Sequence, residues 1–261
     1  MVAKYDILRY LRSRRLLGIV VIEALMLILI TAYLLTLGKK PSADDTVALY
    51  AGFIGTLILI SATLFGGDAI VSEFQGRTGY LLFPQPVKRW AVLIGKFLAS
   101  LIALFIVVAA YYFVALVAAL AISGSFSVLG VGSMLLALLY SVSALAVAYL
   151  ISSVMKGSTG ALILTFAVFI FVFSVLAQLL GSLGGVKPWF VLSFTGDTTR
   201  YILQTPYPMD YVVTQSFGVK GTYTMHYFFP DVGVSIAVML GYILVALLLS
   251  YIFFKRREMS T

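Results

Sequence analysis

The residues best placed for chemistry lie in a charged, turn-rich stretch from Asp68 to Lys96, between two long apolar runs. Glu73 and Arg77 stand four residues apart, the spacing at which opposite charges pair along one face of a helix. Four residues of the stretch are basic, and Lys and Arg bias short loops of membrane proteins toward the cytoplasmic side. The pattern therefore favours contact with a cytoplasmic partner.

Groups for catalysis and metal binding are scarce in this chain. It has no Cys, and His226 is its one histidine, so a Ser-His-Asp triad or a histidine metal site would depend on that residue alone. We interpret His226 as a loop residue among aromatic neighbours. Gly95-Lys96 and Lys156-Gly157 both lack the spacing of a phosphate-cradling loop. We therefore expect no catalytic residue, no metal or cofactor bound by this chain, and no enzyme activity of its own.

The composition indicates that these residues are held by helices embedded in a membrane. Hydrophobic residues make up 62% of the chain, charged residues 11%, and the mean hydropathy of +1.07 lies outside the range of soluble globular proteins. Six segments have the roughly 20 apolar residues that a transmembrane helix needs. They are residues 17–37, 46–65, 90–122, 129–154, 159–183 and 232–254. We predict an all-α polytopic membrane protein in which residues 1–261 form a single transmembrane domain.

The distribution of basic residues sets the predicted orientation. Thirteen of the 18 Lys and Arg residues fall in the N-terminal arm, the second and fourth connections and the C-terminal tail. By the positive-inside rule, the chain is a multi-pass protein of the cell membrane with both termini in the cytoplasm. The net charge of +8 reflects this topology and attraction to membrane lipids, so we expect no nucleic-acid partner. The absence of the heat-labile residues Asn and Cys predicts a thermophilic source.

The N-terminal arm, residues 1–16, alternates basic and apolar residues at near-helical spacing. This pattern is typical of an amphipathic helix that lies along the inner membrane surface. Two interpretations remain open for the arm. It is either a topology anchor or an elbow helix that also contacts the cytoplasmic partner.

A loose motif runs from residue 73 to residue 96, with a Glu in a short helix, a Gly and a Thr, a double Leu, a Pro, a basic residue, and Gly-Lys opening the next span. The residues are Glu73, Gly76, Thr78, Leu81, Leu82, Pro84, Arg89, Gly95 and Lys96. Their order resembles that of the permeases of type-2 ATP-binding-cassette exporters. The six spans, the basic arm and the long last outer loop are similar too, so the resemblance covers nearly the whole chain.

The resemblance implies a pair of permeases, identical or siblings, on two copies of an ATPase subunit that carries ATP and Mg. Residues 68–83 would form the coupling helix, with Asp68 as its cap, Ile70 and Phe74 on the face that enters an ATPase groove, and Pro84 beyond its end. An ordinary interfacial helix is the alternative. The predicted coupling residues are Asp68, Ile70, Glu73, Phe74, Gln75, Arg77 and Thr78.

One acidic residue, Glu23, lies within an apolar span, where a carboxylate is costly and is a functional candidate by default. Its place near the inner interface leaves open a structural pair with Arg14 or Arg15 and a role in a cavity. Scattered hydroxyls and rings in the second and fifth spans predict a largely apolar cargo path, with helix packing as the alternative. The candidate lining residues are Phe53, Thr56, Phe169, Phe173 and Gln178.

The outer loop, residues 184–231, is rich in aromatic residues and contains a predicted β-hairpin around residues 218–221. Trp189, Tyr223 and Phe228 are candidate residues of an outer gate. A belt of aromatic side chains at the membrane surface is the alternative.

These features together predict export of a hydrophobic or amphipathic solute, such as a lipid-like molecule, a drug or a peptide. Export would proceed by alternating access driven by the separate ATPase subunit. One alternative is a membrane subunit that passes ATPase motion to an outer partner without passing cargo. Another is an ion-coupled carrier without an ATPase, which would need several buried carboxylates or discontinuous helices.

Overall fold

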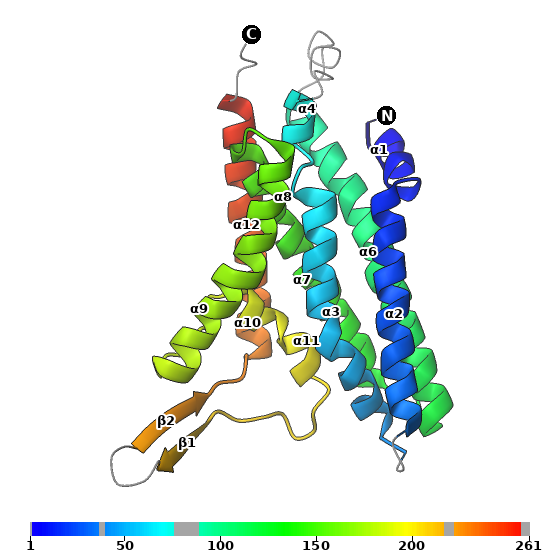
Figure 1. The fold of residues 1–261 in the computed structure, drawn as a ribbon, viewed down its shortest axis with the longest axis vertical. Coiled ribbons are helices and arrows are strands. Elements are labelled where there is room, and N and C mark those ends of the chain that lie inside the picture. Colours follow the sequence, from blue (N-terminus) through cyan, green and yellow to red (C-terminus); the bar gives the residue numbers. More distant parts are fainter. Residues whose placement is uncertain (1, 37–39, 76–88, 217–221, 257–261) are drawn as a thin grey trace.

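A computed structural model describes residues 2–36, 40–75, 89–216 and 222–256 of the chain. Six of its helices are long and apolar enough to cross a membrane, which confirms the predicted all-α polytopic class. Five spans begin and end within a few residues of the predicted bounds, whereas the second runs on into the charged stretch, as Ala43–Glu73. Helix α1 (Val2–Leu11), the short helix α4 (Val71–Gln75) and the end of α12 (Val232–Arg256) lie at the same end of the molecule (Figure 1).

The first helix, α1 (Val2–Leu11), packs against the third span, and a short helix, α4 (Val71–Gln75), follows the second span. Four of the spans are single continuous helices. These are α2 (Arg14–Thr36), α6 (Arg89–Ser123), α7 (Val128–Val154) and α12 (Val232–Arg256). The second span is helix α3 (Ala43–Gly66) together with the turn and short helix that follow it.

The fifth span changes its hydrogen-bonding pattern twice. It runs through α8 (Ser158–Ala167), a π-helical segment η1 (Val168–Phe173), α9 (Ser174–Gln178) and a second π-helical segment η2 (Leu179–Leu183). Short π-helical segments inside α-helices are rare and often mark functional sites. The polar residues Ser174 and Gln178 begin and end the α-helical turn between the two π-helical segments.

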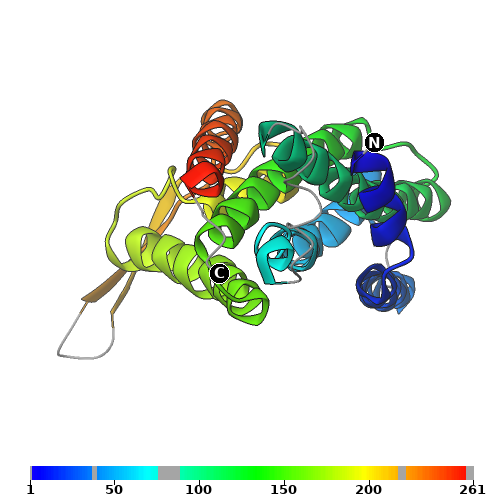
Figure 2. The same ribbon diagram turned by 90° about the horizontal axis from the view of Figure 1, so that it is seen from above.

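Helices α3 and α7 form the centre of the bundle, because α7 contacts α3, α6 and α12 while α3 contacts α2, α6 and α7. Gly66 allows the close approach of α3 to α7, since an added Cβ would lie 2.8 Å from Leu145 and 2.9 Å from Ala148. Seen from above, α2 and the α8–α9 span lie near opposite sides of the bundle (Figure 2). The spans at the sides bury less of their surface than α3 and α7.

Serine caps fix the starts of the two central helices. The Asp45 N–H donates to Ser42 Oγ at 3.1 Å, and the Ser42 hydroxyl donates to the Asp45 carboxylate at 2.7 Å, which stabilises the first turn of α3. Ser127 accepts from the Gly130 N–H at 2.8 Å and donates to Asp44 at 2.6 Å. The Ser127 contact also ties the start of α7 to the first turn of α3.

The predicted hairpin is confirmed as strands β1 (Tyr211–Ser216) and β2 (Thr222–Tyr227), which pair antiparallel with Tyr211 opposite Tyr227. Its turn, residues 217–221, lies outside the described residues.

The predicted outer loop differs from the structure between η2 and β1. Two short helices, α10 (Leu192–Gly196) and α11 (Thr198–Tyr201), fold back against α3, α7 and α12. Figure 1 shows both helices beside the spans rather than beyond their ends. Hydroxyl groups explain how this polar segment is accommodated, because Thr198 donates to Ser235 at 2.8 Å and Ser133 donates to the Thr199 carbonyl.

Candidate functional site

Ion pairs at the end of the molecule that carries both termini join the charged stretch to the surrounding helices, and we name this region the inner junction. Arg15 on α2 donates to both carboxylate oxygens of Asp68, at 2.8 and 2.7 Å, and to the Leu64 carbonyl near the end of α3 at 2.9 Å. Ser158, the first residue of α8, donates to the same carboxylate at 3.2 Å. Asp68 therefore connects three spans, and a planar fork of this kind also fixes their relative orientation.

Two predicted roles change with this geometry. The Asp68 side chain was expected to cap the coupling helix, but its oxygens accept from Arg15 and Ser158 instead. Arg15 was one expected partner of Glu23, and that expectation is wrong because the guanidinium is engaged by Asp68. Glu23 is buried in α2, and within the described ranges no hydrogen bond or ion pair reaches its carboxylate.

A second ion pair links the short helix α4 to the third span. The Glu73 carboxylate accepts from Lys96 Nζ at 2.7 Å, and Asp6 on α1 lies 3.5 Å from the same nitrogen. All three side chains are at least 85% buried, since their exposed fractions are 9% for Lys96, 12% for Glu73 and 15% for Asp6. Glu73 and Lys96 are the first and last residues of the sequence motif. The expected partner, Arg77, lies outside the described residues, as does Thr78.

The start of the coupling segment is buried in the permease itself. Ile70 is 2% exposed, and its N–H and that of Val71 donate to Ser152 Oγ on α7 at 3.0 and 3.2 Å. The prediction that Ile70 enters an ATPase groove is therefore wrong, because its side chain is already part of the hydrophobic core of the permease. Phe74 and Gln75 fall within α4, but their side chains lie outside the described residues.

A buried hydroxyl network attaches α1 to the same junction. The Tyr10 hydroxyl donates to the Phe65 carbonyl at 3.1 Å, and Ser100 Oγ on α6 lies 3.1 Å from the Tyr10 oxygen and 2.7 Å from that of Tyr149 on α7. The N-terminal arm is thus a helix packed onto three spans. This contact agrees with the elbow interpretation as far as the helix and its packing are concerned.

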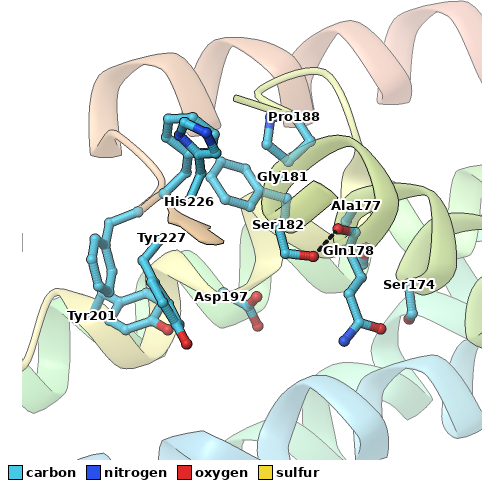
Figure 3. A pocket seen from close by; sticks show the side chains of 14 residues that line it. Ser174, Ala177, Gln178, Gly181, Ser182, Pro188, Asp197, Tyr201, His226 and Tyr227 are labelled. Atoms are coloured by element: carbon cyan, nitrogen blue, oxygen red, sulfur yellow. Dashed lines mark hydrogen bonds between the residues drawn. The ribbon is translucent and has the colours of Figure 1, made fainter. Parts of the chain in front are cut away.

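A cavity of about 370 Å³, which we name the aromatic cavity, lies at the opposite end between the fifth span, α10–α11 and the hairpin. Its rings come from Phe194, Tyr201, His226, Tyr227, Phe228 and Phe229. Ser174, Gln178 and Ser182 supply polar groups from the fifth span, and Asp197 points into the middle of the space (Figure 3). The arrangement combines a large apolar lining with a few convergent polar groups, as small-molecule sites do.

Asp197, between α10 and α11, is an exposed residue that lines the cavity. Partial desolvation by the surrounding protein raises the pKa of its carboxyl to about 6, and the nearby Arg200 opposes that rise. Across the described residues, no hydrogen bond or ion pair reaches this carboxylate. The Ser193 hydroxyl in the same wall is buried and likewise has no partner among the described groups.

A second cavity, of about 230 Å³, lies between α3 and α11, and we name it the polar cavity. It shares Ser174, Ser193, Asp197 and Tyr201 with the aromatic cavity and adds Thr56 and Arg200. Gly196 allows α10 to lie against α7 beside it, because an added Cβ would lie 2.6 Å from the Tyr140 ring. The two cavities therefore meet around one carboxylate.

Two of the five predicted path residues line a cavity in the structure. Thr56 lines the polar cavity and Gln178 lines the aromatic cavity. Phe169 is instead fully buried in the core, with its ring tilted against that of Phe173 at 6.1 Å between ring centres, while the Phe53 side chain is 49% exposed. The packing alternative is the better description of Phe169.

The predicted gate residues are scattered. Phe228 lines the aromatic cavity, stacked on His226 with ring centres 5.9 Å apart. Trp189 lies outside that cavity with half of its surface exposed, and the side chain of Tyr223 lies outside the described residues. Asp197, Ser193 and Arg200 were missed because their segment was assigned to a loop. The signal that could have found them is the short polar run TGDTTR between the apolar runs WFVLSF and YIL.

Comparison with known proteins agrees with this architecture. The family described as ABC-2 family transporter protein matches residues 1–259. A search of curated proteins finds no match. Because the family match runs nearly from end to end, the chain belongs to the ABC-2 transporter family, as a membrane-embedded permease subunit of an ABC transporter.

Proposed function

We propose that this permease subunit exports a hydrophobic or amphipathic solute by alternating access, driven by a separate pair of ATPase subunits at the inner junction. The observation that carries the proposal is the ion pair between Glu73 and Lys96, with Asp6 beside it. It connects the motif segment directly to α6 and α1, so a displacement of α4 is passed to helices rather than absorbed in a loop.

The inner junction also reaches the helices that line the two cavities. Ser152 on α7 holds the backbone at Ile70 and Val71, and Asp68 holds the start of the fifth span through Ser158. The fifth span lines the aromatic cavity at its other end through Ser174 and Gln178. This continuity supports a mechanism in which ATPase closure at one end changes the cavities at the other.

The proposal includes the partners and the orientation. Helix α1, the short helix α4 and the end of α12 lie at one end, and the positive-inside rule assigns that end to the cytoplasm of the cell membrane. ATP and Mg belong to the ATPase subunit. The fifth span exposes large apolar residues, among them Phe166, Phe171 and Val172, which a second permease copy, a sibling permease or lipid would cover.

Coexpression with the candidate ATPase subunit, recognised by a phosphate-cradling GxxxxGK[ST] loop, tests the proposal. The two chains are expected to copurify, and ATPase activity in liposomes is expected to rise when a transported amphiphile is added. An isolated permease that never associates with such a chain would contradict the proposal. An ion-coupled carrier predicts that outcome, although membership of the ABC-2 family disfavours it.

A second candidate function is transmission of ATPase motion to an outer partner without cargo passage. The observation that favours it is the apolar surface at the foot of the hairpin, where Met209 is 84% exposed and Val212 is 55% exposed. ATPase activity that is insensitive to every amphiphile but sensitive to an outer protein would support this alternative over export.

A further inference from the structure

We infer that the aromatic cavity binds an organic cation, in which an ammonium group is attached to an apolar body, and that Asp197 is its counter-charge. The inference rests on the proposed export function in one respect, because it identifies this cation as the cargo or its head group. The binding site itself is argued from the residues of the cavity alone.

The first argument is the charge of the cavity. Among the described residues that line it, Asp197 is the one carboxylate, and neither Lys nor Arg contributes to the wall. Arg200 faces the neighbouring polar cavity, and no ion pair joins it to Asp197 within the described ranges. Asp197 is exposed to the cavity, so its carboxylate is available as the counter-charge of a positively charged ligand that binds there.

The second argument is the chemistry of the remaining wall. Rings from α11, β2 and the chain after β2 surround the carboxylate, with Tyr201 and Phe229 edge to face at 4.9 Å between ring centres. The faces of aromatic rings attract cations, and recognition of quaternary ammonium groups commonly uses such rings. Figure 3 shows Tyr201, Tyr227 and Gln178 around the space into which Asp197 points.

The third argument is the unused hydrogen-bonding capacity. The buried Ser193 hydroxyl has no partner in the described part of the chain, although buried polar groups are normally satisfied. It lies in the wall shared by the two cavities, as do Ser174 and Asp197. These groups are placed to accept from an N–H or to contact a polar substituent beside the charge. An anionic ligand would instead meet the carboxylate and be repelled.

The test measures ligand binding to the full chain in lipid nanodiscs, without the ATPase. Phenyltrimethylammonium and benzenesulfonate are the probes, because both are small water-soluble aromatic ions of opposite charge. Isothermal titration is expected to show binding of the cation at least tenfold tighter than binding of the anion. Asp197→Asn is expected to weaken cation binding tenfold or more, whereas Asp197→Glu, which keeps the charge, stays within about threefold of the wild type.

The matched control is Asp45→Asn, which removes the same charge from an exposed position at the same end of the molecule. It is expected to leave cation binding unchanged. Equal cation affinity in the wild type and in a folded Asp197→Asn variant would overturn the inference. So would equal affinity for the two probes, or no cation binding by the wild type.

If Asp197→Asn fails to fold, Phe228→Leu provides the decision, because it removes one ring from the wall and keeps an apolar side chain. Cation binding is then expected to fall severalfold, and unchanged binding would overturn the inference. Copurification with the ATPase is measured separately. Cation binding without ATPase association would refute the proposed function alone, and ATPase association without cation binding would refute this inference alone.

Discussion

The two ends of the molecule differ in how their acidic side chains are paired. At the inner junction, Asp68 and Glu73 are each held by a basic residue from another helix, at 2.7 Å in both cases. At the other end, Asp197 faces a cavity, and no described residue pairs with it. Paired charges fix helices relative to one another, whereas an unpaired charge leaves a binding capacity open. The inner junction is therefore suited to transmitting motion between helices, and the aromatic cavity is suited to binding a ligand.

The largest effect is expected from breaking the buried pair at the inner junction. Glu73→Ala leaves Lys96, whose side chain is 9% exposed, with the more distant Asp6 as its one counter-charge among the described residues. Loss of one partner of a buried pair costs about 3 kcal/mol, so we expect a lower melting temperature in detergent and loss of ATPase coupling. Lys187→Ala is the control, since its pair with Asp210 is largely exposed and its loss costs under ~1 kcal/mol. Equal melting temperatures for the two variants would contradict this difference.

The second-largest effect is expected from a substitution in α10, the short helix that ends next to Asp197. Gly196→Ala places a methyl group 2.6 Å from the Tyr140 ring, which displaces α10 and with it Asp197. Overpacking of this kind costs about 2 kcal/mol, as measured by chemical or thermal unfolding. Gly55→Ala is the control, because an added Cβ there meets nothing within 4 Å although Gly55 also lines the polar cavity. A Gly196→Ala variant as stable as the wild type would show that α10 is not tightly packed against Tyr140 of α7.

The pH dependence of cation binding sharpens the comparison further. Because partial desolvation raises the pKa of Asp197 to about 6, its carboxylate gains a proton as the pH falls through that value. Affinity for phenyltrimethylammonium is therefore expected to fall about tenfold between pH values of about 7.5 and about 5. The charged and titratable groups that face Asp197 from the surrounding elements are Tyr140, Arg200, Tyr201, His226 and Tyr227.

His226 is the histidine in that set, so a variant at this position is the control for the pH dependence. His226→Gln is expected to keep most of the pH dependence, and Asp197→Asn is expected to remove most of it. Titrations of the two variants at both pH values separate the contributions. A pH dependence that disappears with His226 alone would show that Asp197 is not the group that titrates.

The smallest effect is expected at the more exposed inner pair. Arg15 is 41% exposed, so water screens its interaction with Asp68 and the coupling energy should be about 1 kcal/mol. A double-mutant cycle with Arg15→Gln and Asp68→Asn measures it through the free energy of unfolding. If this coupling energy were as large as that of the Glu73 and Lys96 pair, the exposed fraction of the side chains would not predict which pair is stronger.

Long apolar runs made the fold predictable, because a bilayer requires continuous helices of a known length and all six spans appear where the hydropathy placed them. The motif residues Glu73 and Lys96 form an ion pair in the structure, whereas the predicted coupling role of Glu73 stays a prediction. Their contact with each other could not be predicted, since it depends on how α4 folds back onto α6. Spacing along one helix had suggested Arg77 instead.

The cavities were harder to predict for a related reason. Segment 191–203 has too few apolar residues in succession to register as a membrane-embedded element, and its polar groups are satisfied by hydroxyls far away in the sequence, such as Ser133 and Ser235. Ile70 was misassigned because its apolar side chain was expected to bind the ATPase subunit. The side chain instead packs in the hydrophobic core of the same chain. Contacts between distant segments decide both cases.

The π-helical segments on either side of α9 have a consequence for how the cavity wall changes. Each accommodates wider turns than an α-helix, so conversion of η1 to regular α-helical bonding would change the helical phase of everything beyond it. One residue of slippage corresponds to a rotation of about 100° about the helix axis. Ser174 and Gln178 would then swing away from Asp197 together. If the fifth span changed its bonding in this way, an axial displacement at Ser158 would become a rotation of side chains at the far end.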